Sequence, residues 1–254
     1  MTQQNHSADA GSVDPDEVAR FAGLAAEWWN PAGPLKPLHR LNPLRLAWVK
    51  GEIARQFGRN RDDPVALTGL SILDIGCGGG LLAEPLARMG GAVTGIDPAP
   101  ENIAVARLHA EVSRLTINYR ATTGEALRDA GEQFDVVTLL EVVEHVPDVG
   151  AFVAACAALV KPGGIAIAAT INRTLKAWAL AIIGAEYVLR WLPRGTHSYD
   201  KLVTPAELAA AFRAAGLGVT AETGVMYVPV ADRFRLTSDM DVNYMLAATR
   251  PPAG

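Results

Sequence analysis

The spacing of apolar residues predicts short strands that alternate with helices through the middle of the chain. Strands are expected at Ser71–Ile75, Ala92–Asp97, Ile117–Ala121, Phe134–Leu140 and Ile165–Thr170. The segments between them carry helical spacing, at Leu81–Met89, Glu101–Val112 and Val149–Val160. Phe134–Leu140 is apolar throughout, which is typical of a strand that is buried on both faces. The alternation predicts parallel strand–helix–strand units and a doubly wound sheet.

The segments on either side of this core follow other patterns. Asp14 and Pro15 indicate the start of a helix, and apolar residues continue at helical spacing to Trp28. A proline-punctuated stretch, 31–43, precedes a second expected helix through Arg45 and Ile53. After Thr204, a helix at 205–215 is followed by two strand-like runs, Val219–Val225 and Val242–Thr249. No helix separates those runs, so we expect an antiparallel pair and a mostly parallel sheet of seven strands in all.

These patterns predict one domain rather than two. We expect a disordered tail at 1–13 and a single domain at 14–254, which comprises a helical cap at 14–69, a core at 70–171, an insertion at 172–201 and a C-terminal part at 202–254. The length of 254 residues and the hydrophobic content of 50% suffice for a full core. Two cysteines exclude a disulfide scaffold, and a net charge of −4 argues against a nucleic-acid binder. Residues 1–13 lack the apolar core of a signal peptide, so we expect a cytoplasmic protein.

A glycine-rich loop follows the first core strand and is the sharpest chemical signal. Residues 73–80 read LDIGCGGG and join a predicted buried strand to a helix, where glycines let the backbone turn tightly against a ligand. Asp97 closes the next strand, 21 residues after Gly76, and can accept hydrogen bonds from two ribose hydroxyls. Together these features predict an adenosine-containing cofactor. The sixth position of a dinucleotide fingerprint is Leu81 rather than glycine, which counts against a nucleotide-dependent oxidoreductase.

The position of this loop behind a helical cap, with a closing antiparallel pair, resembles the class I S-adenosylmethionine-dependent methyltransferases. The resemblance implies a Rossmann-like α/β fold. It also implies that the loop, with Gly76 and Gly78, contacts the methionine end of S-adenosylmethionine, and that Asp97 binds the ribose.

A group of titratable residues follows the fourth core strand. On a helical turn, Glu141, Glu144 and His145 would lie at positions i, i+3 and i+4 on one face. Two carboxylates and an imidazole are a plausible ligand set for a divalent cation: Mg²⁺ by its oxygen ligands, with Zn²⁺ or Mn²⁺ left open by the histidine. The same residues can instead form a solvated turn in which Glu144 or His145 acts as a cap.

Further segments narrow the resemblance to the ubiquinone-biosynthesis O-methyltransferases, from about Phe21 to Thr249. The segments that carry it are EWWN at 27–30, KPLHRLNPLR at 36–45, EVVEHVPD at 141–148, VKPGG at 160–164, GAEY at 184–187, GTH at 195–197 and DVNYML at 241–246. This resemblance implies methylation of a ring hydroxyl on polyprenylated catechol precursors and on demethylated ubiquinol. It implies cofactor contacts at Arg45, Gly76, Asp97 and Leu140, the last of which is often methionine in the family. It also supports Glu141, Glu144 and His145 as metal ligands.

The expected chemistry is direct methyl transfer to an oxygen. A phenol with a pKa near ~10 is mostly protonated at neutral pH, so its proton must be removed. A bound cation would favour the phenolate, or His145 could take the proton as a general base. Two alternatives stay open: a metal-dependent RNA 2′-O-methyltransferase, which shares the ExxEH motif, and a non-catalytic subunit of a biosynthetic complex. Other ubiquinone-biosynthesis proteins are possible partners, and no nucleic-acid partner is expected.

The insertion carries a long apolar stretch at 175–192 with three charged residues. On a helix, Lys176, Glu186 and Arg190 fall within an arc of about 80°, which leaves the rest apolar. Aromatic residues and a basic flank suit a helix that lies on an anionic membrane, and we assign this contact to residues 173–195. We therefore expect peripheral association with the inner face of the cytoplasmic membrane. A core helix or an oligomer contact would give the same pattern.

Overall fold

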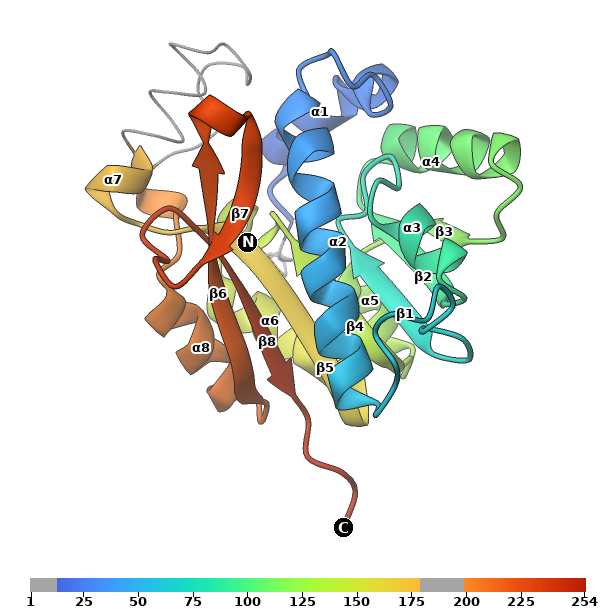
Figure 1. Ribbon diagram of the computed structural model, residues 1–254. Helices are drawn as coiled ribbons and strands as arrows, with labels where there is room; N and C mark the ends of the chain where they lie inside the picture. The colour runs from blue at the N-terminus through green and yellow to red at the C-terminus, as the bar shows by residue number, and fades with distance from the viewer. Residues whose placement is uncertain (1–12, 179–198) are drawn as a thin grey trace, which may run out of the picture.

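The computed structural model describes residues 13–178 and 199–254. In this part of the chain eight strands form one sheet in the order β3-β2-β1-β4-β5-β8-β6-β7 (Figure 1). The strands are β1 (Ser71–Ile75), β2 (Ala92–Asp97), β3 (Asn118–Ala121), β4 (Phe134–Leu140), β5 (Val160–Ile171), β6 (Gly218–Val228), β7 (Arg233–Thr237) and β8 (Asn243–Thr249). The five core strands pair in parallel, and β8 runs antiparallel to both β5 and β6. The predicted doubly wound, mostly parallel sheet is confirmed.

One described strand was not expected from the sequence. Strand β7 pairs antiparallel with the far end of β6 and adds an eighth strand at the edge of the sheet. Its sequence, RFRLT, places arginines at alternate positions, and most of its side chains are exposed. A strand without an apolar run gives no hydrophobic signal, and the sequence therefore predicted seven strands instead of eight.

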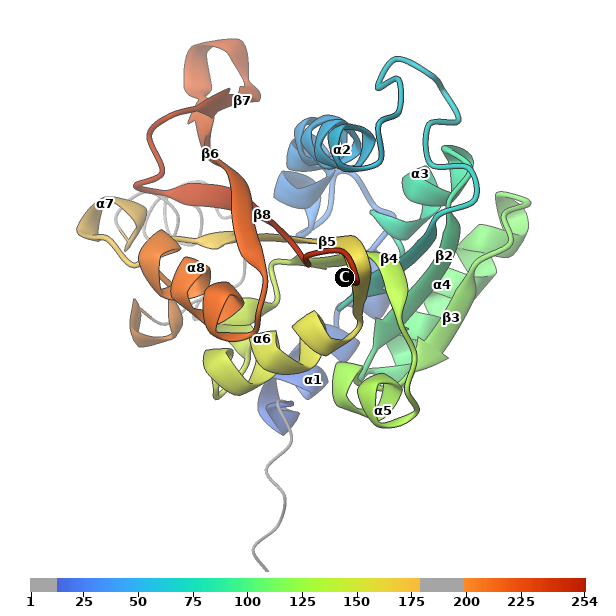
Figure 2. The same cartoon turned by 90° about the horizontal axis from the view of Figure 1, so that it is seen from below.

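Helices cover both faces of the sheet in three layers (Figure 2). The helices on one face are α2 (Lys36–Gln56), α3 (Ala83–Arg88) and α4 (Pro100–Val112), and those on the other are α5 (Gly124–Asp129), α6 (Val149–Ala158) and α8 (Pro205–Ala214). Two large apolar clusters fill the spaces between the layers, one on each side of the sheet. Strand β4 contributes Val136 to one cluster and Val137 to the other, which confirms its burial on both faces.

The N-terminal cap begins where the sequence predicted and then departs from the prediction. Helix α1 (Pro15–Ala22) starts after Asp14, whose side chain accepts a hydrogen bond from the Asp16 backbone amide. A 3₁₀ turn at Ala25–Glu27 follows. Helix α2 begins at Lys36, before Pro43, so the expectation that the helix starts after the proline stretch was wrong. The exposed Pro43 removes only its own backbone donor, while α2 buries Leu41, Val49 and other residues against the sheet.

Much of the predicted insertion and tail lies outside the described residues. Of 172–201, the structure describes the start, with α7 (Leu175–Ala177) and Trp178, and the end, with a 3₁₀ turn at Tyr199–Lys201. The GAEY and GTH segments at 184–187 and 195–197 fall outside it, as do residues 1–12 of the predicted tail. Within the described ranges, no helix combines the length and the apolar character that crossing a bilayer requires. The membrane-facing role of 173–195 therefore stays a prediction.

Candidate active site

A single large cavity opens at the carboxyl ends of the core strands. Its volume is about 1200 Å³, and it is walled by α1, α2, the loops after β1, β2 and β4, and strands β6 and β7. Figure 1 shows α1 and the tip of the β6–β7 hairpin at this same end of the molecule. The carboxyl edge of an open α/β sheet is where such folds bind their ligands. The cavity is therefore the candidate active site.

The glycine loop forms one part of this wall. Gly76 and Gly78 have φ angles of +68° and +51°, a region that side chains with a Cβ rarely adopt. Gly76 lines the cavity, whereas Gly78 faces Trp28: a Cβ at Gly78 would lie 2.2 Å from Cζ2 of the indole. The loop is held from behind by the backbone of Gly78, which donates to Asp97 Oδ2 over 3.0 Å. Trp28, which the sequence did not single out as a site residue, therefore supports the loop.

Asp97 is fixed at the cavity wall by three donors. Besides the Gly78 amide, the Ala99 backbone N–H and the Asn102 side chain donate to its other oxygen over 2.9 and 3.1 Å. Asn102 in turn accepts a hydrogen bond from Trp28 Nε1. Burial raises the pKa of Asp97 despite these bonds. A carboxylate oriented in this way retains lone pairs for a ligand's hydroxyl groups, and the assignment of Asp97 to the ribose stays a prediction.

A second acidic residue, Asp74, lies in the cavity wall at the end of β1. Its Oδ1 accepts from the Thr138 hydroxyl over 2.8 Å, while its buried Oδ2 has no hydrogen-bond partner in the described structure. Burial raises its pKa to about 7. An unpartnered buried carboxylate is costly, and a positively charged ligand group would satisfy it. The only signal for Asp74 in the sequence is its position shortly before the first glycine of the loop, which does not indicate a role.

Arg45 and Leu140 both reach the cavity, as predicted, but Arg45 has a protein partner. Its Nη2 donates to the carboxylate of Glu141 across the space between α2 and the end of β4. Glu141 has a φ angle of +57°, which turns this side chain away from the helical course that the spacing assumed. Desolvation raises the pKa of Glu141 to about 7, against the opposing effect of Arg45.

The expected helical turn with three ligands on one face does not form. Only Val143–His145 makes a 3₁₀ turn, and Glu141 precedes it. Glu144 is buried: its Oε2 accepts from the Thr170 hydroxyl over 2.8 Å, and its Oε1 lies 4.0 Å from His145 Nε2. Across residues 13–178 and 199–254, no three histidine, cysteine or acidic side chains stand where they could together hold a metal ion. The convergence predicted from i, i+3, i+4 spacing was therefore wrong.

His145 instead pairs with an acidic residue of the N-terminal helix. Its Nδ1 lies 3.3 Å from Oε2 of Glu17, and the edge of its ring contacts Phe21 with 5.1 Å between ring centroids. Burial of the imidazole lowers its pKa, but Glu17 and Glu144 outweigh this and leave it raised above the usual 6.5. The contact with His145 in turn lowers the pKa of Glu17 to about 2. Sequence reasoning missed Glu17, because nothing in a helix-start pattern shows which distant residue its carboxylate will meet.

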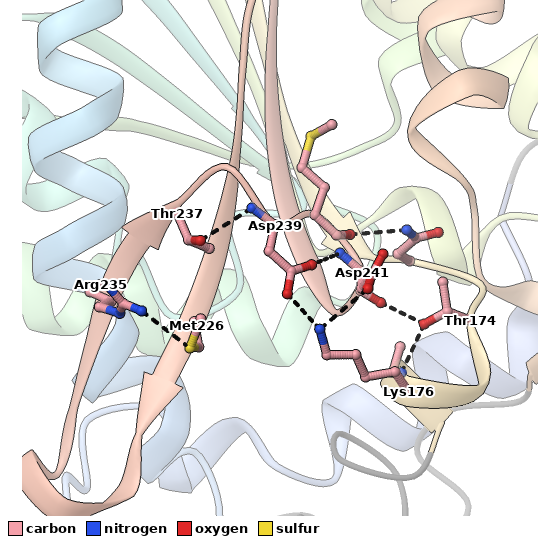
Figure 3. Close-up of polar contacts among 10 residues, drawn as sticks. Thr174, Lys176, Met226, Arg235, Thr237, Asp239 and Asp241 are labelled. Atoms are coloured by element: carbon pink, nitrogen blue, oxygen red, sulfur yellow. Dashed lines mark hydrogen bonds and ion pairs between the residues drawn. The ribbon is translucent and has the colours of Figure 1, made fainter.

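Two lysines, each paired with two carboxylates, hold the rim of the cavity. Lys201, the last residue of the insertion, lies 3.1 Å from Glu17 and 3.2 Å from Asp14, which joins the end of the insertion to the start of the chain's N-terminal helix α1. At the start of the insertion, Lys176 of α7 pairs with Asp239 and Asp241 in the loop between β7 and β8 (Figure 3). Both described ends of the insertion are thus tied to walls of the cavity.

Comparison with known proteins gives this arrangement a context. A family model described as "Methyltransferase domain" matches residues 45–222. A protein of Brucella ovis named ubiquinone biosynthesis O-methyltransferase is 58% identical over 240 residues, which is 94% of this chain and 97% of that protein. One of the same name from Methylobacterium nodulans is 56% identical over 242 residues, or 95% and 97% of the two chains. The crystal structure of magnesium protoporphyrin IX methyltransferase from Synechocystis PCC 6803 with bound SAH superposes on this chain with a TM-score of 0.62. The two sequences are 20% identical, and the match covers 92% of this chain and 93% of that one, which shows a shared fold.

Proposed function

This chain belongs to the family of ubiquinone biosynthesis O-methyltransferases, and from that membership we propose that it methylates a ring hydroxyl of polyprenylated catechol precursors and of 3-demethylubiquinol. The methyl donor of this class of enzyme is S-adenosylmethionine. The observation that carries the proposal is the shared cavity, in which the glycine loop and Asp97 stand at one part of the wall and His145 at another. A donor and an acceptor can therefore meet within one cavity.

The residues at the cavity wall fit S-adenosylmethionine, which supplies an electrophilic methyl group on its sulfonium. We propose that Asp97 accepts hydrogen bonds from the ribose and that Gly76 allows the cofactor close to the backbone. The unpartnered Oδ2 of Asp74 suits a positively charged group at the methionine end. Arg45 would release Glu141 and bind the carboxylate of the cofactor instead. Leu140 would supply an apolar contact to the cofactor. Gly78 keeps the loop in place against Trp28.

We propose that His145 removes the proton of the acceptor hydroxyl. Glu17 contacts Nδ1, which fixes the ring and directs the other nitrogen, Nε2, as the proton acceptor. Only the neutral imidazole can act as a base. Because the pKa of His145 is raised, a rise in pH through that pKa converts the enzyme from its inactive to its active protonation state.

Replacement of Glu17 by glutamine should move the acidic limb of the pH–rate profile to lower pH. The Glu17 carboxylate raises the pKa of His145, and glutamine removes that charge, so His145 should lose its proton at a lower pH. The profile of kcat/KM against pH measures this shift. Glu111→Gln, on the exposed surface of α4, is the matched control and should leave the profile in place. An unmoved limb in Glu17→Gln would show that Glu17 does not act through His145.

A divalent cation at Glu141, Glu144 and His145 is a second proposal, and it requires that these side chains, which do not converge in the described structure, rearrange around the ion. The donor chemistry suits Mg²⁺, Zn²⁺ or Mn²⁺, and Glu144 Oε1 lacks a hydrogen-bond partner in the described structure. Glu141, however, faces Arg45, so it would have to release that guanidinium to bind the ion. Treatment with EDTA should abolish turnover and addition of the cation should restore it. If EDTA leaves turnover unchanged, the proposal that catalysis requires a bound cation is contradicted. Removal of the proton would then be assigned to His145 alone.

We propose peripheral association with the cytoplasmic membrane through residues 173–195, where a prenylated substrate would be met. The exposed Leu175 and Trp178, at the start of this segment, support a surface that contacts lipid. Binding to anionic liposomes should fall as salt increases, and a variant lacking 173–195 should bind less. Equal binding by that variant in a sedimentation assay would contradict the proposal. Association with other ubiquinone-biosynthesis proteins is a further proposal that co-purification tests.

The experiment that tests the proposed function compares acceptors. Wild-type enzyme with labelled S-adenosylmethionine should methylate a short-tailed demethylubiquinol and leave RNA unlabelled. Label in RNA would instead favour the RNA 2′-O-methyltransferase. Cofactor binding without transfer to either acceptor would favour a non-catalytic subunit.

A further inference from the structure

We propose that the cavity has an apolar groove that binds the first isoprene units of the substrate's tail. The groove consists of Leu38 and Leu41 of α2, Val225 and Tyr227 of β6, and Phe234 of β7, all of which line the cavity. This inference rests on the proposed function, because a prenylated acceptor is what brings a hydrocarbon chain to the site. The occupant is the tail of the molecule being methylated, and its ring remains beside His145.

The groove begins where the reaction centre ends. Leu41 and Val225 belong to one buried apolar cluster, against which Phe234 and Leu140 both pack. Leu140, which we assign to the cofactor, directly precedes Glu141, the partner of Arg45, on the same stretch of wall. An acceptor ring bound next to the cofactor would therefore adjoin the groove. An apolar chain on that path would leave water and contact side chains over its length.

Polar and acidic side chains are unevenly placed in the cavity wall. Asp74, Asp97 and Asn102 lie near the glycine loop, among apolar residues such as Ile75 and Leu82. The groove presents aliphatic and aromatic side chains instead. The total volume of about 1200 Å³ exceeds the roughly 300–1000 Å³ of sites for one drug-sized ligand. The cavity is thus large enough for two ligands, of which the polar cofactor would occupy one end and the acceptor the other.

The groove is held in shape before any ligand arrives. Asp232, at the tip of the β6–β7 hairpin, is bound by Arg40 of α2 and by the Tyr227 hydroxyl. The rings of Tyr227 and Phe234 lie on neighbouring strands with 5.1 Å between their centroids. Helix α2 lies beside β7, so this ion pair closes one side of the groove (Figure 1). A groove that is already ordered loses little conformational entropy when it binds a chain.

The loop after β7 is fixed as well. Asp239 lines the cavity, and it is bound by Lys176, which also reaches Asp241 (Figure 3). The Thr237 hydroxyl accepts a hydrogen bond from the Asp239 backbone amide over 3.1 Å. The hairpin is therefore tied to α2 at its tip and to α7 at its base. The predicted strand β6 and the unexpected strand β7 therefore form a fixed wall for the acceptor.

The test compares two acceptors of the same ring, one without a tail and one with two isoprene units. The substitution Phe234→Ala should lower kcat/KM for the tailed acceptor about tenfold and leave that for the tailless one unchanged, since only the tail loses contact area. Phe234→Trp fills part of the groove with a larger side chain and should also lower kcat/KM for the tailed acceptor alone. Val230→Ser, at the fully exposed tip of the hairpin, is the matched control and should change neither value.

The outcomes separate this inference from the proposed function. An equal loss of kcat/KM for both acceptors in Phe234→Ala and Phe234→Trp, with cofactor affinity and circular dichroism unchanged, would overturn the proposal that the groove binds the tail. It would leave the proposed methyltransferase function intact. Unchanged ratios of tailed to tailless kcat/KM would overturn it in the same way. Failure of wild-type enzyme to methylate either ring would overturn the proposed function itself.

Discussion

Replacement of His145 by alanine is expected to lower kcat by about 10²–10⁴-fold, the usual contribution of a positioned acid or base. The acceptor hydroxyl has a pKa near ~10 and would keep its proton at neutral pH without an adjacent group to take it. His145 is half-buried among Glu17, Phe21 and Glu144 in the cavity wall, so its ring is held where a bound acceptor can meet it. Initial rates at saturating S-adenosylmethionine measure the effect.

The His145→Ala variant should still bind the cofactor. Asp97 and Gly76, which we assign to the cofactor, lie at the ends of β2 and β1, whereas His145 follows β4. Calorimetric titration should therefore give a Kd close to that of the wild type. A variant that retains its kcat would remove His145 from the mechanism, both as a base and as a metal ligand. A variant that loses cofactor binding would place His145 in the cofactor site instead.

Replacement of Asp97 by alanine is expected to raise the Kd for S-adenosylmethionine by about 10²–10⁴-fold. Two hydrogen bonds between the ribose and a charged group contribute about 1.5–3 kcal/mol each, and about 1.4 kcal/mol corresponds to a factor of ten. The substitution also leaves three protein donors without their acceptor: the amides of Gly78 and Ala99 and the side chain of Asn102. The glycine loop should therefore lose its support as well as the ligand contact.

Two controls separate these effects. Asp97→Asn keeps the size of the side chain but turns an amide NH₂ group toward one of the donors that Asp97 now accepts from. Its Kd for S-adenosylmethionine should therefore lie between those of the alanine variant and the wild type. Asp62→Ala, in an exposed loop, removes the same charge from the molecule and should leave the Kd unchanged. A wild-type Kd in Asp97→Ala, measured on protein with an unchanged melting temperature, would contradict the assignment of Asp97 to the ribose.

The core of the fold could be predicted because its signals are local. Strands β2 and β4 have the bounds that their apolar runs indicated, and α8 begins after Thr204, whose hydroxyl and Glu207 form a capping box. The glycine loop and Asp97 were also predictable, because a tight turn requires glycine and the end of the next parallel strand lies beside it. In each case the residues that determine the structure are close in sequence or repeat with a simple period.

The features that the sequence did not show depend on distant partners. Glu17 and His145 are brought together by the docking of α1, and Arg45 meets Glu141 across 96 positions of sequence. Helical spacing assumed a regular turn at Glu141, where the backbone is left-handed. Strand β7 is exposed and forms because β6 offers it an edge to pair with, rather than because of its own apolar pattern.

The central claim is that one cavity brings S-adenosylmethionine and a ring hydroxyl together for methyl transfer to oxygen. The measurement that tests it most directly is incubation of the enzyme with methyl-labelled S-adenosylmethionine and a short-tailed demethylubiquinol, followed by NMR assignment of the labelled position in the product. We predict a label on the ring oxygen and one equivalent of S-adenosylhomocysteine for each methyl transferred. A bound cofactor without labelled product, or a label on a ring carbon, would contradict the account.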